Sequence, residues 1–145
     1  MTIDIHGTVD QQLRRSRQRY TSGRRQLVDL LADSDRPVTI PELMERGAEQ
    51  SQSSLYRNLA ILEQCGAVHR LVSTDDVSRY ELTEELSEHH HHHLVCRSCG
   101  RIEDFTLPPD LEAAIFRAVD TVRSGCDFDV EEHRFDLIGT CQDCH

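Results

Sequence analysis

The sequence lacks tryptophan, long apolar runs and a secretory signal. Aromatic residues make up only 5% of its 145 residues. No apolar run approaches the roughly 18 residues that a membrane-spanning helix requires. The first twenty residues, MTIDIHGTVDQQLRRSRQRY, lack the short apolar core of a secretory signal. These absences predict a soluble cytoplasmic protein without a membrane partner.

Common catalytic motifs are also missing. The chain contains no HExxH motif, no phosphate-binding loop and no evident nucleophile with its base. We therefore expect that the protein is not an enzyme. A rival interpretation is a metal-dependent hydrolase, because a His-rich carboxylate site can hold a catalytic metal with an open position.

Charge is unevenly distributed along the chain. The net charge of −10 argues against indiscriminate affinity for nucleic acid. Residues 11–31 nevertheless contain six Arg against Asp29 alone, a local charge of +5. Residues 87–145 contain five Arg against twelve acidic residues, a local charge of −7. A basic beginning and an acidic second half indicate two modules with different partners.

Four of the six cysteines form two C-x-x-C pairs. The pairs are Cys96 with Cys99 and Cys141 with Cys144. In a reducing compartment, paired C-x-x-C knuckles are typical of Zn²⁺. Four thiolates leave no position for a substrate, so the site is expected to be structural. Two disulfides or a thiol switch are the alternatives. Cys65 and Cys126 are predicted to be small buried hydrophobic residues.

The first half of the chain predicts three helices followed by a β-hairpin. Leu27, Leu30 and Leu31 have helical spacing after an N-cap at Thr21 or Ser22. A capping box at Thr39-x-x-Glu42 begins a second helix. A third helix carries Leu55, Leu59 and Leu62 on one stripe and ends near Gly66. The segments VHRLV and RYELT then form the strands. This order favours a winged helix, although other small α+β domains share it.

The exposed face of the third helix suits DNA. It carries Ser53, Ser54, Tyr56 and Arg57, which can contact base edges and phosphates in a major groove. A plain solvated helix face is the alternative. The preceding Arg-rich segment from Arg14 to Arg25, which includes Arg19 and Arg24, is expected to contact phosphate or a narrow minor groove.

The second half predicts a small β-β-α-β module. Residues 92–96 and 101–105 are expected strands, and a helix begins at Pro109 and Asp110. Its apolar stripe consists of Leu111, Ile115, Val119 and Val122. The last strand, DVEEHRFDLIGTC, places His133, Phe135 and Leu137 on one face. The two predicted domains are residues 1–84 and 85–145.

Five consecutive histidines, residues 89–93, lead directly into the first cysteine pair. Their interior position argues against a purification tag. In an extended strand, His91 and His93 face one side while His90 and His92 face the other. The run can therefore begin two metal sites, each of which requires ligands from elsewhere. The candidates are His69, Glu81, Glu112 and His133. Imidazole with carboxylate suits Zn²⁺, Fe²⁺ or Mn²⁺.

Together, HHHHHLVCRSCG, the terminal CQDC and the preceding SSLYRNLAILEQCGAVHRL resemble the ferric uptake regulator superfamily of bacterial metal-responsive repressors, over roughly residues 21–144. The resemblance implies a homodimer with an N-terminal winged-helix DNA-binding domain and a C-terminal dimerisation domain. It implies a structural zinc at the four paired cysteines and matches Tyr56 and Arg57 to the family's recognition helix. The implied regulatory site is His91 and His93 with Glu81 and His69, and the implied additional site is His90, His92, Glu112 and His133.

Departures from the family pattern bear on the sensed ion. Iron-responsive members typically carry a His where this chain has Pro37, and His69 favours the zinc-uptake-regulator branch. The hairpin ends in Glu81 without a Cys, which leaves iron, manganese or peroxide sensing open. Asp104 is a further candidate carboxylate.

These observations predict a zinc-responsive repressor that binds double-stranded operator DNA when its regulatory site is filled, controlling metal-uptake genes. In this hypothesis the regulatory site joins the DNA-binding half to the dimerisation half. A metal-buffering protein is the further alternative, and it predicts tight metal binding without metal-dependent DNA affinity.

Overall fold

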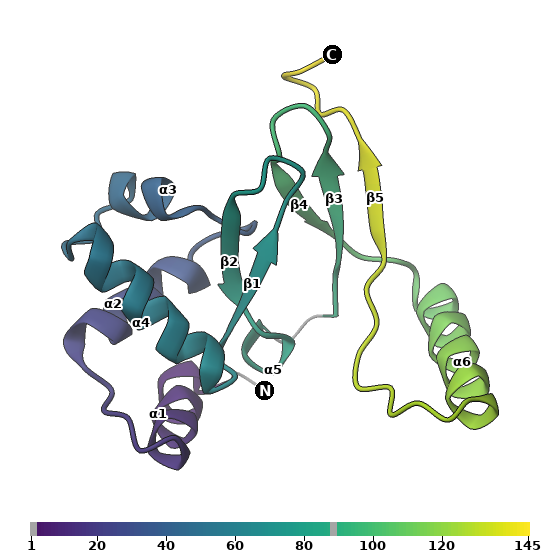
Figure 1. Cartoon of the computed structure of the whole chain (residues 1–145), viewed down its shortest axis with the longest axis horizontal. Coiled ribbons are helices and arrows are strands. Elements are labelled where there is room, and N and C mark those ends of the chain that lie inside the picture. The colour runs from purple at the N-terminus through teal and green to yellow at the C-terminus, as the bar shows by residue number, and fades with distance from the viewer. Residues whose placement is uncertain (1–2, 88–89) are drawn as a thin grey trace.

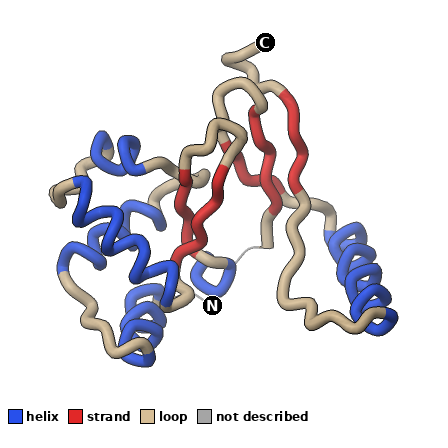
Figure 2. Tube along the Cα trace, in the orientation of Figure 1, coloured by secondary structure: helices blue, strands red, loops and turns tan. Residues whose placement is uncertain are grey.

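The structure of the chain, a computed structural model, describes residues 3–87 and 90–145. The helices are α1 (Ile5–Arg15), α2 (Ser22–Ala32), α3 (Ile40–Glu45), α4 (Gln52–Gln64), α5 (Glu84–Ser87) and α6 (Pro109–Gly125). The strands are β1 (Val68–Val72), β2 (Ser78–Leu82), β3 (His92–Cys96), β4 (Ile102–Phe105) and β5 (Asp136–Gly139). Helices α1 to α4 gather on one side of the β1–β2 hairpin, and the second sheet with α6 lies on the other side (Figures 1 and 2). This arrangement confirms the predicted α+β class with an N-terminal winged helix.

Side-chain caps set the starts of α2, α3 and α4. Thr21, Thr39 and Ser51 occupy the three N-cap positions, and each side-chain oxygen accepts a hydrogen bond from a backbone N–H in the first turn. Such a cap satisfies a donor that the helix itself leaves unpaired. Gly66 follows α4 with a φ of 90°, a left-handed conformation that favours glycine. The three predicted helices are therefore confirmed.

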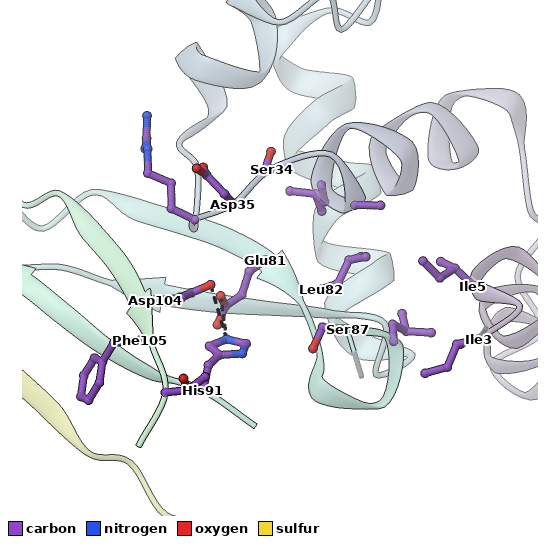
Figure 3. Close-up of a pocket in the computed structure, with 15 residues that line it drawn as sticks. Ile3, Ile5, Ser34, Asp35, Glu81, Leu82, Ser87, His91, Asp104 and Phe105 are labelled. Atoms are coloured by element: carbon purple, nitrogen blue, oxygen red, sulfur yellow. Dashed lines mark hydrogen bonds and ion pairs between the residues drawn. The ribbon is translucent and has the colours of Figure 1, made fainter. Parts of the chain in front are cut away.

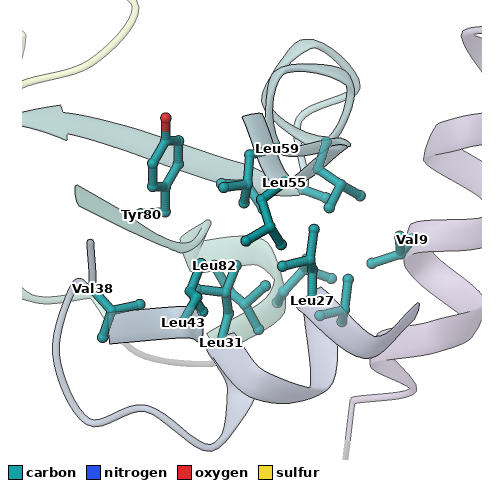
Figure 4. Packing of buried hydrophobic residues seen from close by; sticks show 14 of the residues in the cluster. Val9, Leu27, Leu31, Val38, Leu43, Leu55, Leu59, Tyr80 and Leu82 are labelled. Carbon is teal, nitrogen blue, oxygen red and sulfur yellow. The ribbon is translucent and has the colours of Figure 1, made fainter. Parts of the chain in front are cut away.

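The apolar core lies within this N-terminal half (Figure 4). Leu55, Leu59 and Leu62 line the inner face of α4 and are fully buried, together with Leu27 of α2. Burying a leucine side chain stabilises a fold by roughly 1.5–3 kcal/mol. The antiparallel β1–β2 hairpin closes one side of the core, so the hairpin is held firmly against α2 and α4.

Sequence patterning missed α1. Asp4 caps this helix by accepting a hydrogen bond from the Gly7 N–H, and Val9 and Leu13 are fully buried against the core. The apolar residues Ile5, Val9 and Leu13 have i, i+4, i+8 spacing, but the rest of the helix sequence is polar. Leu86 of α5, which lies beyond the predicted boundary at residue 84, also packs into this core.

The second half forms a three-stranded sheet in the order β4-β3-β5. Strand β3 pairs antiparallel with β4 and parallel with β5. The predicted strand over residues 129–141 is correct only at 136–139, so His133 and Phe135 lie in the preceding irregular segment. The pairing between β3 and β5 begins with His93 and Asp136. Because β3 itself begins at His92, it offers no strand partner for residues before 135.

Helix α6 stands apart from the rest of the chain (Figure 1). None of its residues is buried, and Leu111, Phe116 and Val122 are each about half exposed or more. Among the described residues, no helix is both long and apolar enough to cross a membrane.

Candidate metal centres and nucleic-acid interface

The four paired cysteines meet at one end of the second sheet. Their Sγ atoms all lie within 4.8 Å of one another. The first pair lies at and just after the end of β3, and the second pair follows β5. The Cys141 N–H donates a hydrogen bond to Cys96 Sγ at 3.3 Å. Backbone hydrogen bonds from Cys141 and Cys99 lower the pKa of the Cys96 thiol to about 6. A compact set of four sulfur ligands, one of them readily ionised, fits tetrahedral zinc.

The two remaining cysteines lie outside this group. Cys65 is half-buried at the end of α4, where burial raises its thiol pKa. Cys126 is exposed after α6, so the prediction that it is buried is wrong. The error arises because α6 has no covering layer within this chain.

A second cluster joins the two halves of the molecule. It consists of Glu81, His91, His93 and Asp104, whose candidate ligand atoms lie within 4.8 Å of one another. Glu81 Oε2 lies 3.1 Å from His91 Nε2, and Glu81 Oε1 lies 2.9 Å from His93 Nε2. Figure 3 shows Glu81, His91 and Asp104 pointing toward one another. Glu81 is on β2 of the winged helix, whereas the other three belong to the second module.

The electrostatics of this cluster suit a cation. Burial raises the pKa of Glu81, but hydrogen bonds from His91 and His93 outweigh it and lower this pKa to about 2. Burial and the neighbouring Glu81 charge raise the pKa of Asp104 to about 6. Asp104 Oδ1 is buried without a hydrogen bond. The buried carboxylate of Glu81 and the half-buried carboxylate of Asp104 form, with two imidazoles, a donor set that fits a divalent metal.

Asp104 occupies the position that sequence analysis gave to His69. The β3–β4 register pairs His93 with Asp104, so the strand partner delivers this carboxylate directly beside the imidazole. His69 is the register partner of Glu81 on β1 and lines the same cavity as the histidine run. Its ring nitrogens nevertheless lie outside the four-residue cluster.

A third cluster lies on the opposite face of β3. His90, His92 and Glu112 come together there, with His92 Nε2 only 2.6 Å from Glu112 Oε1. The His133 ring lies 5.3 Å from the His90 ring, measured between centroids. His90 Nε2, Glu112 Oε2 and His133 Nε2 are all buried without hydrogen bonds. His90 Nε2 and Glu112 Oε2 form an ion pair at 3.3 Å, and imidazole nitrogens that converge on a carboxylate form a donor set that fits a metal ion.

The second cluster borders a cavity of about 520 Å³ between the halves. Glu81, His91 and Asp104 form its polar wall, while Ile3, Ile5 and Leu82 contribute apolar surface (Figure 3).

The predicted DNA-contacting residues occupy different environments. Ser53, Tyr56 and Arg57 are exposed on α4, with Tyr56 52% exposed. Ser54 is half-buried in the first turn of α4, where its Oγ accepts a hydrogen bond from the N-cap residue Ser51. The Arg24 side chain makes two hydrogen bonds within the chain. Its Nε donates to Asn58 Oδ1 at 3.1 Å, and its Nη1 donates to the backbone carbonyl of the exposed Arg19 at 2.6 Å.

Comparison with known proteins gives a consistent result. The ferric uptake regulator family profile matches residues 15–138. The peroxide-responsive repressor PerR of Staphylococcus aureus is 30% identical over 136 residues, which cover 91% of this chain and 86% of PerR. Among solved structures, a zinc-bound manganese uptake regulator is 29% identical, with a TM-score of 0.63 and coverage of 92% and 98%. The Helicobacter pylori ferric uptake regulator has a TM-score of 0.72 at 22% identity, with coverage of 97% and 91%, and shares the fold.

Proposed function

The chain belongs to the ferric uptake regulator family and is a metal-responsive regulator, and we propose that it represses transcription by binding operator DNA as a homodimer when its regulatory site holds a divalent cation. The observation that carries this proposal is the contact of Glu81 with His91 and His93. It links the recognition helix, through the hairpin packed on α4, to the module that carries the exposed α6.

The regulatory site comprises Glu81, His91, His93 and Asp104. A bound cation would supply the positive charge that allows Glu81 and Asp104 to remain ionised side by side. Glu81 would then hold the winged helix at a defined angle to the second module. Since two half-sites on DNA lie about 34–36 Å apart per helical turn, a fixed angle in both subunits favours simultaneous binding of both recognition helices.

The homodimer would bury the apolar face of the second module. Leu111, Phe116 and Val122 of α6 and Ile138 of the edge strand β5 are exposed in the single chain. Apolar surface of this kind marks an interaction site. A second copy would cover both elements and leave α4 accessible to the major groove, where Tyr56 and Arg57 would contact DNA, supported by Ser53, Ser54, Arg19 and Arg24.

The donor set bears on which ion is sensed. Two imidazoles and two carboxylates without a thiolate suit Fe²⁺ and Mn²⁺ as well as Zn²⁺. Iron, manganese or peroxide sensing therefore gains support relative to the zinc prediction, which relied on His69. Zinc sensing is supported by the place of His69 opposite Glu81. The Cys96, Cys99, Cys141 and Cys144 site would hold a permanent structural zinc, and the His90, His92, Glu112 and His133 site would hold an additional ion.

The direct test is a DNA-binding titration under buffered Zn²⁺, Fe²⁺ and Mn²⁺, with metal content measured alongside. The duplex would be selected from a random-sequence pool by the metal-loaded wild-type protein. His91→Ala/His93→Ala protein should stay folded and dimeric but lose metal-dependent binding. The matched control, His90→Ala/His92→Ala, removes two imidazoles from the other face of the same strand and should retain more of the response.

Normal DNA binding by the His91→Ala/His93→Ala variant would refute the proposed role of the regulatory site. Tight metal binding by the wild type without any metal-dependent DNA affinity would instead favour a metal buffer. Metal-dependent hydrolysis by the purified protein would favour an enzyme.

A further inference from the structure

The tip of the β1–β2 hairpin lies against the first cysteine knuckle. Ser73 Oγ donates a buried hydrogen bond of 2.5 Å to the Gly100 carbonyl. Thr74 Oγ1 donates to the Cys96 carbonyl at 2.8 Å. Figure 1 shows this tip beside the loop that connects β3 to β4. The contact therefore joins the winged helix to the second module, at the opposite end of the hairpin from α5.

The two surfaces fit closely at Gly100. This residue is buried and has a φ of 78°, and a Cβ added there would lie 2.3 Å from the Asp75 carboxylate. Glycine therefore allows both the left-handed turn of the knuckle and the close approach of the hairpin tip. The Gly100 N–H donates to the Cys96 carbonyl, so that carbonyl serves both the knuckle turn and the contact with Thr74.

An ion pair between the buried Arg79 and the more exposed Asp75 shapes the hairpin tip. Asp75 accepts two hydrogen bonds from Arg79, at 2.9 and 3.0 Å, in a bidentate arrangement. Arg79 is only 6% exposed. Bidentate pairs of this kind fix geometry as well as contributing energy. The tip is thus held in the shape that presents Ser73 and Thr74 to the knuckle.

We infer that the structural cysteine knuckle is a second anchor for the winged helix and helps to set its orientation for DNA binding. This inference rests on the proposed function. Glu81 attaches the hairpin near its α5 end, and Ser73 and Thr74 attach its tip. A single attachment point leaves the DNA-binding half free to rotate about that point, whereas two separated points remove much of this freedom. The cysteine site then serves DNA recognition in addition to holding the second module together.

The two anchors favour the same arrangement of the halves, so they are thermodynamically coupled. Removing the tip contact is expected to weaken DNA binding and regulatory-metal binding together, because coupling between sites is reciprocal. The structural zinc, whose four sulfur ligands do not include the hairpin, is expected to stay bound.

The test is the Ser73→Ala/Thr74→Val variant of the full-length, metal-loaded dimer. Two readouts are needed: amide hydrogen exchange at residues 73–77, and affinity for the selected duplex. We expect faster exchange at the tip and about tenfold weaker DNA binding, as for the loss of two ordinary hydrogen bonds. Thr74→Ser, which keeps the hydroxyl, should bind DNA like the wild type. Asp76→Asn removes a charge from the same turn at an exposed position and serves as the matched control.

Unchanged exchange and unchanged DNA affinity in the double variant would overturn the inference. Tighter DNA binding would also overturn it, because the knuckle would then be sequestering the hairpin tip. If the double variant loses structural zinc, Thr74→Val alone provides the same comparison. If the wild type shows a protected tip but binds no duplex with any metal, the proposed function fails while the anchor itself is still tested by hydrogen exchange.

Discussion

The two halves of the molecule are stabilised in different ways. The N-terminal half buries leucines from α1, α2, α3 and α4 against its hairpin. In the second half, the buried positions among described residues 90–145 are His92, His93, Cys96, Gly100 and Ile102. Three of these are candidate metal ligands. We therefore expect the winged helix to be stabilised mainly by apolar burial, and the second module to depend on bound metal and, in the proposed dimer, on a partner that covers α6.

The largest expected effect follows from removing a cysteine ligand. Cys96→Ser should unfold the second module and abolish dimerisation, because structural zinc contributes on the order of 10 kcal/mol of apparent folding free energy. Cys126→Ser is the matched control, since Cys126 is exposed and lies outside the cluster. Zinc content, thermal unfolding and molecular mass in solution would be compared. Equal melting temperatures and equal molecular masses for the two variants would contradict the expectation that the second module depends on its cysteine site.

A core truncation should affect the other half. Leu59→Ala removes a fully buried side chain and is expected to lower the free energy of unfolding by about 2–5 kcal/mol. Structural zinc content should be unchanged, because the cysteines lie in the other module. Tyr56→Ala on the exposed face of α4 should change stability much less. Chemical denaturation, monitored together with zinc release, measures the free energy of unfolding and the zinc content. Zinc loss that coincides with unfolding of the core would show that the two halves fold as one unit.

Single substitutions can identify the fourth regulatory ligand. Asp104→Asn should weaken regulatory-metal affinity by more than about 100-fold, since residues that merely support a ligand typically account for 10–100-fold. His69→Gln should weaken it less, because His69 lies outside the cluster. Competition with a metal-binding dye would rank the two variants. The reverse order would restore His69 as the ligand and strengthen the case for zinc sensing.

The smallest expected effect is on pH dependence. The pKa of Asp104 is raised to about 6, whereas metal binding requires the ionised carboxylate. Protons therefore compete more strongly as pH falls through about 6, and regulatory-metal affinity should decrease from pH 7 to pH 5. In a plot of the logarithm of metal affinity against pH, Asp104→Asn should lose roughly one proton's worth of slope relative to the wild type. Identical slopes for the two proteins would show that Asp104 is not a ligand.

The sequence predicted the parts of the fold that follow local chemistry. The caps at Thr21 and Thr39 and the stripe of Leu55, Leu59 and Leu62 identified α2, α3 and α4. The alternation of a strand separated the histidines into two sets, and the structure brings each set together with a carboxylate. Helix α1 was missed because its apolar stripe is only Ile5, Val9 and Leu13, in an otherwise polar segment.

The remaining differences depend on long-range pairing. Asp104 enters the proposed regulatory cluster through the register between β3 and β4, and sequence spacing does not specify which residue lies opposite His93. The same difficulty made the predicted last strand too long. The contact of Ser73 and Thr74 with the knuckle also depends on how the halves pack, and no local pattern marks it.

The most direct measurement is anomalous diffraction from crystals of the dimer loaded with the sensed ion, recorded at that metal's absorption edge. The account predicts a peak bound jointly by Glu81 of the winged helix and by His91, His93 and Asp104 of the second module. A peak whose protein ligands all lie within residues 90–145 would contradict it, since nothing would then connect the metal to the DNA-binding half.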